Sequence, residues 1–251
     1  MPADYAVLAP VYTSLGLADF AEALTPRLID YAQRNDWMGR RILDAGCGTG
    51  ASLEWLTRRN YITVGVDLSP EMLTVGTQRL EAAGLYHDLR QGDIRHLGEE
   101  LEILDLVLAL DVVNELNSLR DLEAFFHCAY QVLNPGRWLV FDMHTIQGLS
   151  QAAAMGEKLT LNDSHLTVTT TNSYDYDRQI LEQRYLIFQR DGDVWMRSEG
   201  ARMLRGYPAQ AIVSLLQRSG FQTKHVITTG FDNFEPGVSS ADRIIFLAEK
   251  H

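Results

Sequence analysis

The sequence of 251 residues predicts an α/β fold whose centre is a doubly wound, largely parallel β-sheet. Three observations support this prediction. Short apolar runs alternate with helical patterns between residues 41 and 143, which is the order that a doubly wound sheet requires. The run 104–110 is almost continuously apolar, as in a strand that is covered on both faces. A glycine-rich turn follows the first apolar run and leads into a helical pattern.

The same patterns place the individual elements. Ser69 and Pro70 suit the N-cap and first turn of a helix, and Gly84 suits its C-cap. An earlier helical pattern spans 17–33, in which Pro26 marks a kink or a new start. We expect strands at 41–45, 62–67, 86–91, 104–110 and 137–143, and helices at 51–59, 70–83 and 119–133.

Residues 146–205 differ from the preceding part, because they are β-rich and alternate polar with apolar side chains. The pair Asp191-Gly192 is a hairpin signal. This segment predicts an antiparallel β lid inserted after the fifth strand, with runs at 167–171, 181–188 and 194–197.

The chain then returns to the core. An amphipathic helix is expected at 208–219, and the runs 221–229 and 243–248 predict a terminal antiparallel strand pair around a loop at 231–240. The expected organisation is therefore one core formed by 1–145 and 206–251, with 1–40 as a capping segment and 146–205 as the lid.

The glycine-rich turn spans residues 44–50, Asp-Ala-Gly-Cys-Gly-Thr-Gly. Glycines permit positive φ and let a ligand approach the backbone, and the following helix start offers unpaired N–H groups. Asp67 ends the next apolar run, 23 residues after Asp44. A carboxylate at about this distance from a glycine turn typically binds the hydroxyls of a ribose. The pattern predicts a nucleoside cofactor.

The glycine spacing decides between cofactors. A dinucleotide site prefers G-x-G-x-x-G, with the pyrophosphate at the helix N-terminus. Here Asp44 precedes the turn, where it would repel a pyrophosphate but could hold a cationic amino-acid tail through water or backbone amides. A nicotinamide-dependent dehydrogenase is therefore disfavoured.

Three segments, 44–50, 66–73 and 92–94, resemble the successive cofactor-binding motifs of class I S-adenosylmethionine-dependent methyltransferases of the small-molecule type. The resemblance covers residues 5–145 well and the remainder loosely. It implies a Rossmann-like seven-stranded sheet, with S-adenosylmethionine as cofactor and S-adenosylhomocysteine as product. It also implies methyl transfer to the N or O atom of a small acceptor, by in-line attack on the sulfonium methyl.

The resemblance assigns roles to cofactor-binding residues. Asp67 would bind the ribose, Leu68 and Met72 would lie near the adenine, and Asp93 and Ile94 would bind its edge. A turn-forming role is the alternative for Asp93, and Asp111, Asn114 and Glu115 are equally consistent with solvated residues at a helix start. The full implied set is Tyr12, Asp44, Ala45, Gly46, Gly48, Asp67, Leu68, Met72, Asp93, Ile94, Leu110 and Asp111.

Acceptor contacts are implied more loosely. The N-terminal segment with Tyr5 and Tyr12 resembles segments that fold over the cofactor, and Arg205 and Tyr207 resemble a segment that points to the acceptor cleft. His144 follows the fifth strand and could contact the substrate or act as a base, although a lone histidine at a strand end is more often structural. A base is needed only if the acceptor must lose a proton.

Composition limits the partners. The formal net charge is −11, and the 3 lysines and 19 arginines are scattered, so nucleic acid and anionic membrane surfaces are disfavoured. Cys47 and Cys128 do not form a disulfide framework and predict reduced thiols in a cytoplasmic protein. No membrane-length apolar run and no metal-ligand spacing occurs in the sequence.

Several alternatives stay open at this stage. The chain could be an RNA or protein methyltransferase, or a non-catalytic S-adenosylmethionine-binding module that regulates or scaffolds a partner. We expect a monomer or a homodimer formed through the lid. The aromatic residues of the lid are expected to be packing residues and not the lining of an acceptor pocket. They are Tyr174, Tyr176, Tyr185, Phe188 and Trp195.

Overall fold

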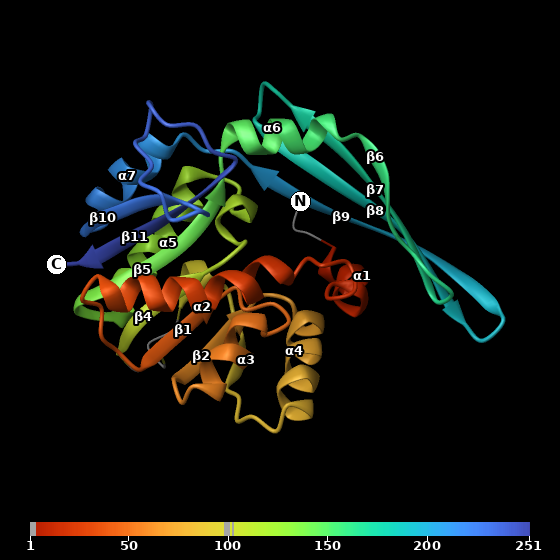
Figure 1. The fold of residues 1–251 in the computed structure, drawn as a ribbon, viewed down its shortest axis with the longest axis horizontal. Coiled ribbons are helices and arrows are strands. Elements are labelled where there is room, and N and C mark those ends of the chain that lie inside the picture. The colour runs from red at the N-terminus through yellow and green to blue at the C-terminus, as the bar shows by residue number, and fades with distance from the viewer. Residues whose placement is uncertain (1–3, 98–100, 102) are drawn as a thin grey trace.

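The computed structural model describes residues 4–97, 101 and 103–251, and it contains two sheets (Figure 1). The larger sheet has seven strands in the order β10-β11-β5-β4-β1-β2-β3. Strands β1 to β5 are parallel, whereas β11 is antiparallel to both β5 and β10. The predicted doubly wound sheet and terminal pair are confirmed. Its strands are β1 (Arg41–Ala45), β2 (Ile62–Asp67), β3 (Leu89–Gln91), β4 (Leu104–Ala109), β5 (Leu133–His144), β10 (Phe221–Thr228) and β11 (Arg243–Lys250).

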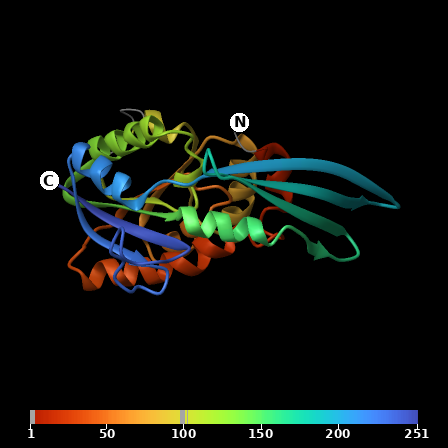
Figure 2. The same ribbon diagram turned by 90° about the horizontal axis from the view of Figure 1, so that it is seen from above.

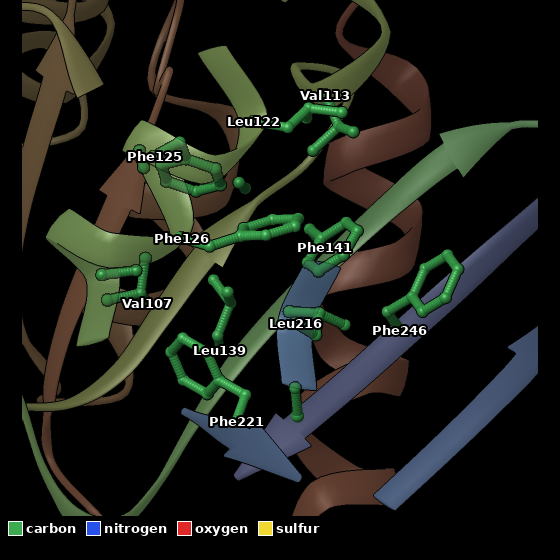
Figure 3. Packing of buried hydrophobic residues seen from close by; sticks show 14 of the residues in the cluster. Val107, Val113, Leu122, Phe125, Phe126, Leu139, Phe141, Leu216, Phe221 and Phe246 are labelled. Atoms are coloured by element: carbon green, nitrogen blue, oxygen red, sulfur yellow. The ribbon is translucent and has the colours of Figure 1, made fainter. Parts of the chain in front are cut away.

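The central strands are buried on both faces, and their side chains alternate between two cores. Val107 of β4 belongs to the core under α5 and α7, whereas Leu106 and Leu108 belong to the core under α2 and α3. Figure 3 shows the first core, in which the stacked rings of Phe141 and Phe246 lie 5.0 Å apart between their centroids. These helices are α2 (Asp19–Arg34), α3 (Ala51–Arg58), α5 (Leu119–Val132) and α7 (Ala209–Arg218).

A side-chain cap explains where the helix after β2 begins. Helix α4 (Pro70–Ala82) starts after Ser69, whose Oγ accepts a hydrogen bond from the Met72 N–H at 3.2 Å. Pro26 lies inside α2 without ending it. Helix α4 lies close to the glycine-rich turn, because Gly76 of this helix faces Gly48 and Thr49 without a side chain between them.

Two strands of the seven-stranded sheet differ most from their predicted bounds, and the lid strands extend beyond the predicted runs 167–171, 181–188 and 194–197. Strand β5 begins at Leu133 and passes through Pro135 and Gly136, with an irregular register beside β4. The turn residues made this part of the sequence resemble a loop. Strand β3 is shorter than predicted because it pairs with only Gly65–Asp67 at the edge of the sheet.

The predicted antiparallel lid is present as a separate four-stranded sheet that projects from the core (Figures 1 and 2). Helix α6 (Ile146–Ala154), which the sequence patterns did not predict, precedes it and is capped by Thr145. The strands are β6 (Glu157–Asn162), β7 (Leu166–Asp175), β8 (Ile180–Asp191) and β9 (Val194–Arg205).

The N-terminal segment joins the lid to the core. It comprises α1 (Tyr5–Leu8) and the 3₁₀ helix η1 (Ala9–Val11). Leu8 and Val11 pack among lid residues that include Val168 and Tyr185. The Asp4 N–H donates to the Ala201 carbonyl at 2.9 Å, which ties the segment to β9.

Candidate active site

A cavity of about 470 Å³ lies at the carboxyl ends of β1, β2 and β4, beneath the N-terminal segment and β9. Its volume falls in the range of small-molecule sites, and parallel sheets bind ligands at this edge. The lining comes from six parts of the chain: Asp4–Ala6 and Tyr12; Gly46 and Gly48; Asp67–Ser69, Glu71 and Met72; Gly92–Arg95; Leu110–Val112 and Glu115–Asn117; and Met203 of β9.

A second cavity of about 40 Å³ adjoins the first and shares Tyr12 and Gly46 with it. Asp44 lines this smaller space, where burial and the neighbouring Asp67 raise the pKa of its carboxyl to about 7. Ala45 is fully buried in β1 and lines neither cavity. The smaller cavity therefore extends the site to the beginning of the glycine-rich turn.

The glycine-rich turn is held by backbone hydrogen bonds and by a close neighbour. Gly46 and Cys47 donate their N–H groups to the Val66 carbonyl at 2.7 and 3.1 Å. Gly46 has φ of +78°, and a Cβ there would lie 2.4 Å from Val112 Cγ2. The turn therefore needs glycine both for its backbone conformation and for its contact with the loop after β4.

We expect Gly46→Ala to reduce the affinity for S-adenosylhomocysteine at least about tenfold, because the methyl group must displace Val112 or the turn. Gly84→Ala is the matched control, since Gly84 also has positive φ (+67°) but a Cβ added there would meet nothing within 4 Å. It should cost stability without affecting the affinity. Calorimetric titration of both variants measures this difference, and equal affinities would contradict it.

Asp67 ends β2 with its carboxylate fixed by two backbone donors. Gly48 N–H donates to Oδ2 at 2.8 Å, and Ser69 N–H donates to Oδ1 at 2.9 Å. Burial raises the pKa of Asp67 in spite of these donors. Each carboxylate oxygen keeps a lone pair for a ligand hydroxyl. Leu68 is exposed and Met72 is buried beside it in the same cavity wall.

Asp93 and Ile94 lie in the cavity wall beyond β3. Arg95 holds the Asp93 carboxylate, with Nη2 at 2.6 Å from Oδ2, and its hydrogen bonds lower the pKa of Asp93. Arg95 Nη1 also donates to Asp121 at 2.8 Å. Asp93 is therefore an ionised hydrogen-bond acceptor, and its side chain also caps the short helix η2 (Ile94–His96).

Asp111 is a partly buried carboxylate between two arginines. Its Oδ2 lies 3.0 Å from Arg202 Nη2, and its Oδ1 lies 2.9 Å from Arg243 Nη2. Burial by itself would raise the pKa of Asp111, but the two guanidinium groups outweigh it and lower the pKa to about 2. Asp111 has φ of +60°, and its N–H donates to Asp142 Oδ1 at 2.8 Å.

Glu115 completes this network and was missed as a site residue. It ends the 3₁₀ helix η3 (Val113–Glu115), accepts a hydrogen bond from Tyr5 and lies 3.2 Å from Arg202 Nη2. Burial raises its pKa to about 7, although Arg202 acts in the opposite direction. Asn114 is not solvated, because it is buried and binds backbone atoms of His144, whereas Asp111 and Glu115 are partly exposed at the cavity.

Three predicted acceptor contacts do not line either cavity. His144 Nε2 lies 3.9 Å from Asp111 Oδ1, and burial together with Arg243 lowers the pKa of His144 to about 4. Arg205 donates from its Nη1 to the Arg178 carbonyl at 3.3 Å. Tyr207 is buried and donates to the Leu116 carbonyl. By contrast, the predicted Tyr5 and Tyr12 both line the main cavity.

Comparisons with known proteins agree with this architecture. Residues 42–136 match the family model described as "Methyltransferase domain". The "Putative methyltransferase YqeM" of Bacillus subtilis is 26% identical over 84% of each chain. A "Ubiquinone biosynthesis O-methyltransferase" of Azorhizobium caulinodans is 39% identical, over 39% of this chain and 37% of that protein.

Two solved structures show the same fold over almost the whole chain. An S-adenosylmethionine-dependent methyltransferase from Clostridium acetobutylicum has a TM-score of 0.82 and 24% identity, covering 98% of each chain. The amino pentose methyltransferase CalS10 of Micromonospora echinaspora has a TM-score of 0.70 and 19% identity, covering 96% of this chain and 97% of that one.

These findings show a methyltransferase-domain match over residues 42–136 and a fold shared, over almost the whole chain, with solved S-adenosylmethionine-dependent methyltransferases. Within the described residues, no helix has the length and apolar character needed to cross a membrane.

Proposed function

We propose that the protein transfers a methyl group from S-adenosylmethionine to the N or O atom of a small-molecule acceptor. The observation that carries this proposal is the continuous cavity, which runs from the glycine-rich turn past Asp67 to Tyr5 and Glu115. The nucleoside end and the acceptor end of the reaction would thus share one space beneath the N-terminal segment.

The residues present fit the cofactor. Gly46 and Gly48 would face its amino-acid tail, Asp67 would accept from the ribose hydroxyls, and Asp93 with Ile94 would bind the adenine edge. Asp44 has a pKa of about 7 and is therefore partly ionised at neutral pH, so it adds negative charge near the tail, which suits a cationic ligand. The charge of Asp111 is offset by Arg202 and Arg243. When bound, S-adenosylmethionine supplies an electrophilic methyl group on a positively charged sulfur.

The chain itself would contribute orientation and exclusion of water. Tyr12 is buried and packs with Ala51 and Met72, so it closes the cavity over the turn. Tyr5 and Met203 cover the acceptor end from α1 and β9. Holding an acceptor in line in a desolvated site is a major source of acceleration for a displacement reaction.

A small acceptor agrees with the features of this chain. The net charge of −11 disfavours RNA, and residues of the N-terminal segment line the cavity. CalS10 and KedS8, whose names describe an amino pentose and a sugar N-methyltransferase, have the same fold. Amino- or hydroxyl-bearing metabolites are therefore the first acceptors to test.

The proposal also includes a cytoplasmic location and either a monomer or a homodimer formed through the lid. The tip of the β8–β9 hairpin supports the second arrangement, because Val194, Trp195 and Met196 expose apolar side chains there. Exposed apolar side chains that cluster at a tip are suited to covering by a second copy.

Labelled methyl transfer tests the acceptor class. The protein is incubated with methyl-labelled S-adenosylmethionine and separate small-molecule, RNA and protein fractions of a cell extract. We expect label in the small-molecule fraction, and none with the Asp67→Ala variant. Label confined to RNA or protein would replace the proposed acceptor. No transfer by a protein that still binds the cofactor would favour the non-catalytic module.

A further inference from the structure

Two carboxylates, Asp111 and Glu115, line the same end of the cavity and share Arg202 between them. Such a pair can divide its tasks when the surroundings give the two groups different proton affinities. Arg202 is almost fully buried, with a side chain 3% exposed, so this contact is desolvated. The difference between the two carboxylates therefore follows from their other partners.

Both oxygens of Asp111 are bound by guanidinium groups, which disfavours protonation of this carboxylate. Arg202 contacts its Oδ2, and Arg243 contacts its Oδ1, while Asp142 accepts from its backbone N–H. The two guanidinium groups keep its carboxylate ionised at neutral pH, with a pKa of about 2 against the opposing effect of burial. Asp111 is a fixed negative charge.

Glu115 is arranged differently. The contacts from Tyr5 and Arg202 both fall on Oε1, and among the described residues Oε2 has no hydrogen-bond partner. The side chain is 20% exposed and lines the cavity. Burial raises its pKa to about 7, near the value that suits a general base at neutral pH. One oxygen is anchored, and the other is available to a ligand.

We infer that Glu115 is the catalytic base of this enzyme, and that its Oε2 accepts the proton that the acceptor loses during methyl transfer. This inference rests on the proposed function. The acceptor N or O lone pair bonds to the methyl carbon as the C–S electron pair returns to sulfur, and the acceptor proton moves to Oε2. The product is S-adenosylhomocysteine, and the glutamic acid later releases its proton to solvent.

Tyr5 is the positioning residue for this base. Burial raises the pKa of its phenol, so Tyr5 stays protonated and donates to Glu115. Tyr5 belongs to α1, which is tied to β9 through Asp4 and Ala201. The base is thus oriented by the same segment that covers the cavity. His144 is a weaker candidate, because it lines neither cavity.

Sinefungin provides a test that needs no knowledge of the acceptor. This analogue carries an amine where S-adenosylmethionine carries the transferred methyl, whereas S-adenosylhomocysteine carries nothing there. A carboxylate beside the methyl position should favour sinefungin. We expect Glu115→Gln to reduce the ratio of the two affinities at least about tenfold while leaving S-adenosylhomocysteine binding nearly unchanged. Glu123→Gln, an exposed carboxylate paired with Arg218, is the control.

The pH dependence of the affinity ratio is a second readout. Glu115 faces Tyr5 and Arg202, with Asp111 and Asp67 nearby. As pH rises through about 7, Glu115 loses its proton, so the preference for sinefungin should increase. Asp44 also has a pKa of about 7, so the increase is assigned to Glu115 only if Glu115→Gln abolishes it. We expect Tyr5→Phe to shift the midpoint of this increase.

The outcomes separate the two proposals. A ratio that is unchanged in Glu115→Gln, or a wild-type ratio that is flat between about pH 6 and 8, would overturn the role of Glu115. In either case S-adenosylhomocysteine would still bind. If neither ligand binds to folded wild-type protein, it is the proposed function that fails.

Discussion

Asp67→Ala is expected to weaken S-adenosylhomocysteine binding about 100-fold or more. The variant would lose the two charge-assisted hydrogen bonds that the carboxylate accepts from the ribose hydroxyls, each worth roughly 1.5–3 kcal/mol. The variant would also release the Gly48 and Ser69 N–H groups, which shape the cavity wall by donating to this side chain. Calorimetric titration measures the loss directly.

Asp30→Ala is a suitable control for this variant. Asp30 is an exposed carboxylate on α2 that pairs with Arg34 on the surface, so its removal should leave the affinity unchanged. Asp67→Asn adds a conservative comparison, because the amide oxygen can still accept one of the hydrogen bonds. Wild-type affinity in Asp67→Ala would show that this carboxylate does not bind the cofactor.

Arg202→Met is expected to lower the free energy of unfolding by about 3 kcal/mol. Removing one partner of a buried ion pair leaves a charge without compensation, which typically costs about 3–5 kcal/mol. Here the cost falls at the lower end, because Asp111 keeps Arg243 and Glu115 can take up a proton. Urea denaturation at neutral pH measures the change.

Arg197→Met is the matched control on the same strand. Its guanidinium is 58% exposed and pairs with Glu199 at the surface, so the loss should stay within about 0.5 kcal/mol. Similar urea midpoints for Arg197→Met and Arg202→Met would mean that the ion pairs of Arg202 with Asp111 and Glu115 contribute little to stability. A small loss in Arg202→Met alone would have the same meaning.

Much of the fold could be predicted from the sequence because its signals are local. The apolar run of β4, the glycine-rich turn and the Ser69-Pro70 helix start each depend on neighbouring residues. Helix α6 was missed because its short pattern opens a β-rich segment. The early start of β5 was missed because Pro135 and Gly136 have the composition of a turn, and pairing with β4 overrides it.

The cofactor end of the site could be predicted from local sequence patterns, whereas the acceptor end could not. The residues of the three cofactor motifs lie near one another in the sequence, and most of them line the cavity. The acceptor end depends on contacts between distant segments: Tyr5 and Glu115 are 110 positions apart, and Asp111 and Arg202 are 91 apart. A single sequence gives no signal for such pairs.

His144, Arg205 and Tyr207 were predicted to contact the acceptor, but contacts with distant segments hold them elsewhere. Asn114 binds the carbonyls of His144 and Arg205, and Tyr207 donates to Leu116. These residues therefore support the loop after β4 from behind the cavity wall. These residues lie close to the site, but their side chains or backbone groups support the loop after β4 and do not line the cavity.

Calorimetric titration of the wild-type protein with S-adenosylhomocysteine and NAD in parallel tests the central claim most directly. The cavity, the glycine-rich turn and the fixed Asp67 carboxylate predict saturable binding of S-adenosylhomocysteine, with no heat from NAD. Binding of NAD by folded protein that does not bind S-adenosylhomocysteine would contradict the proposed site.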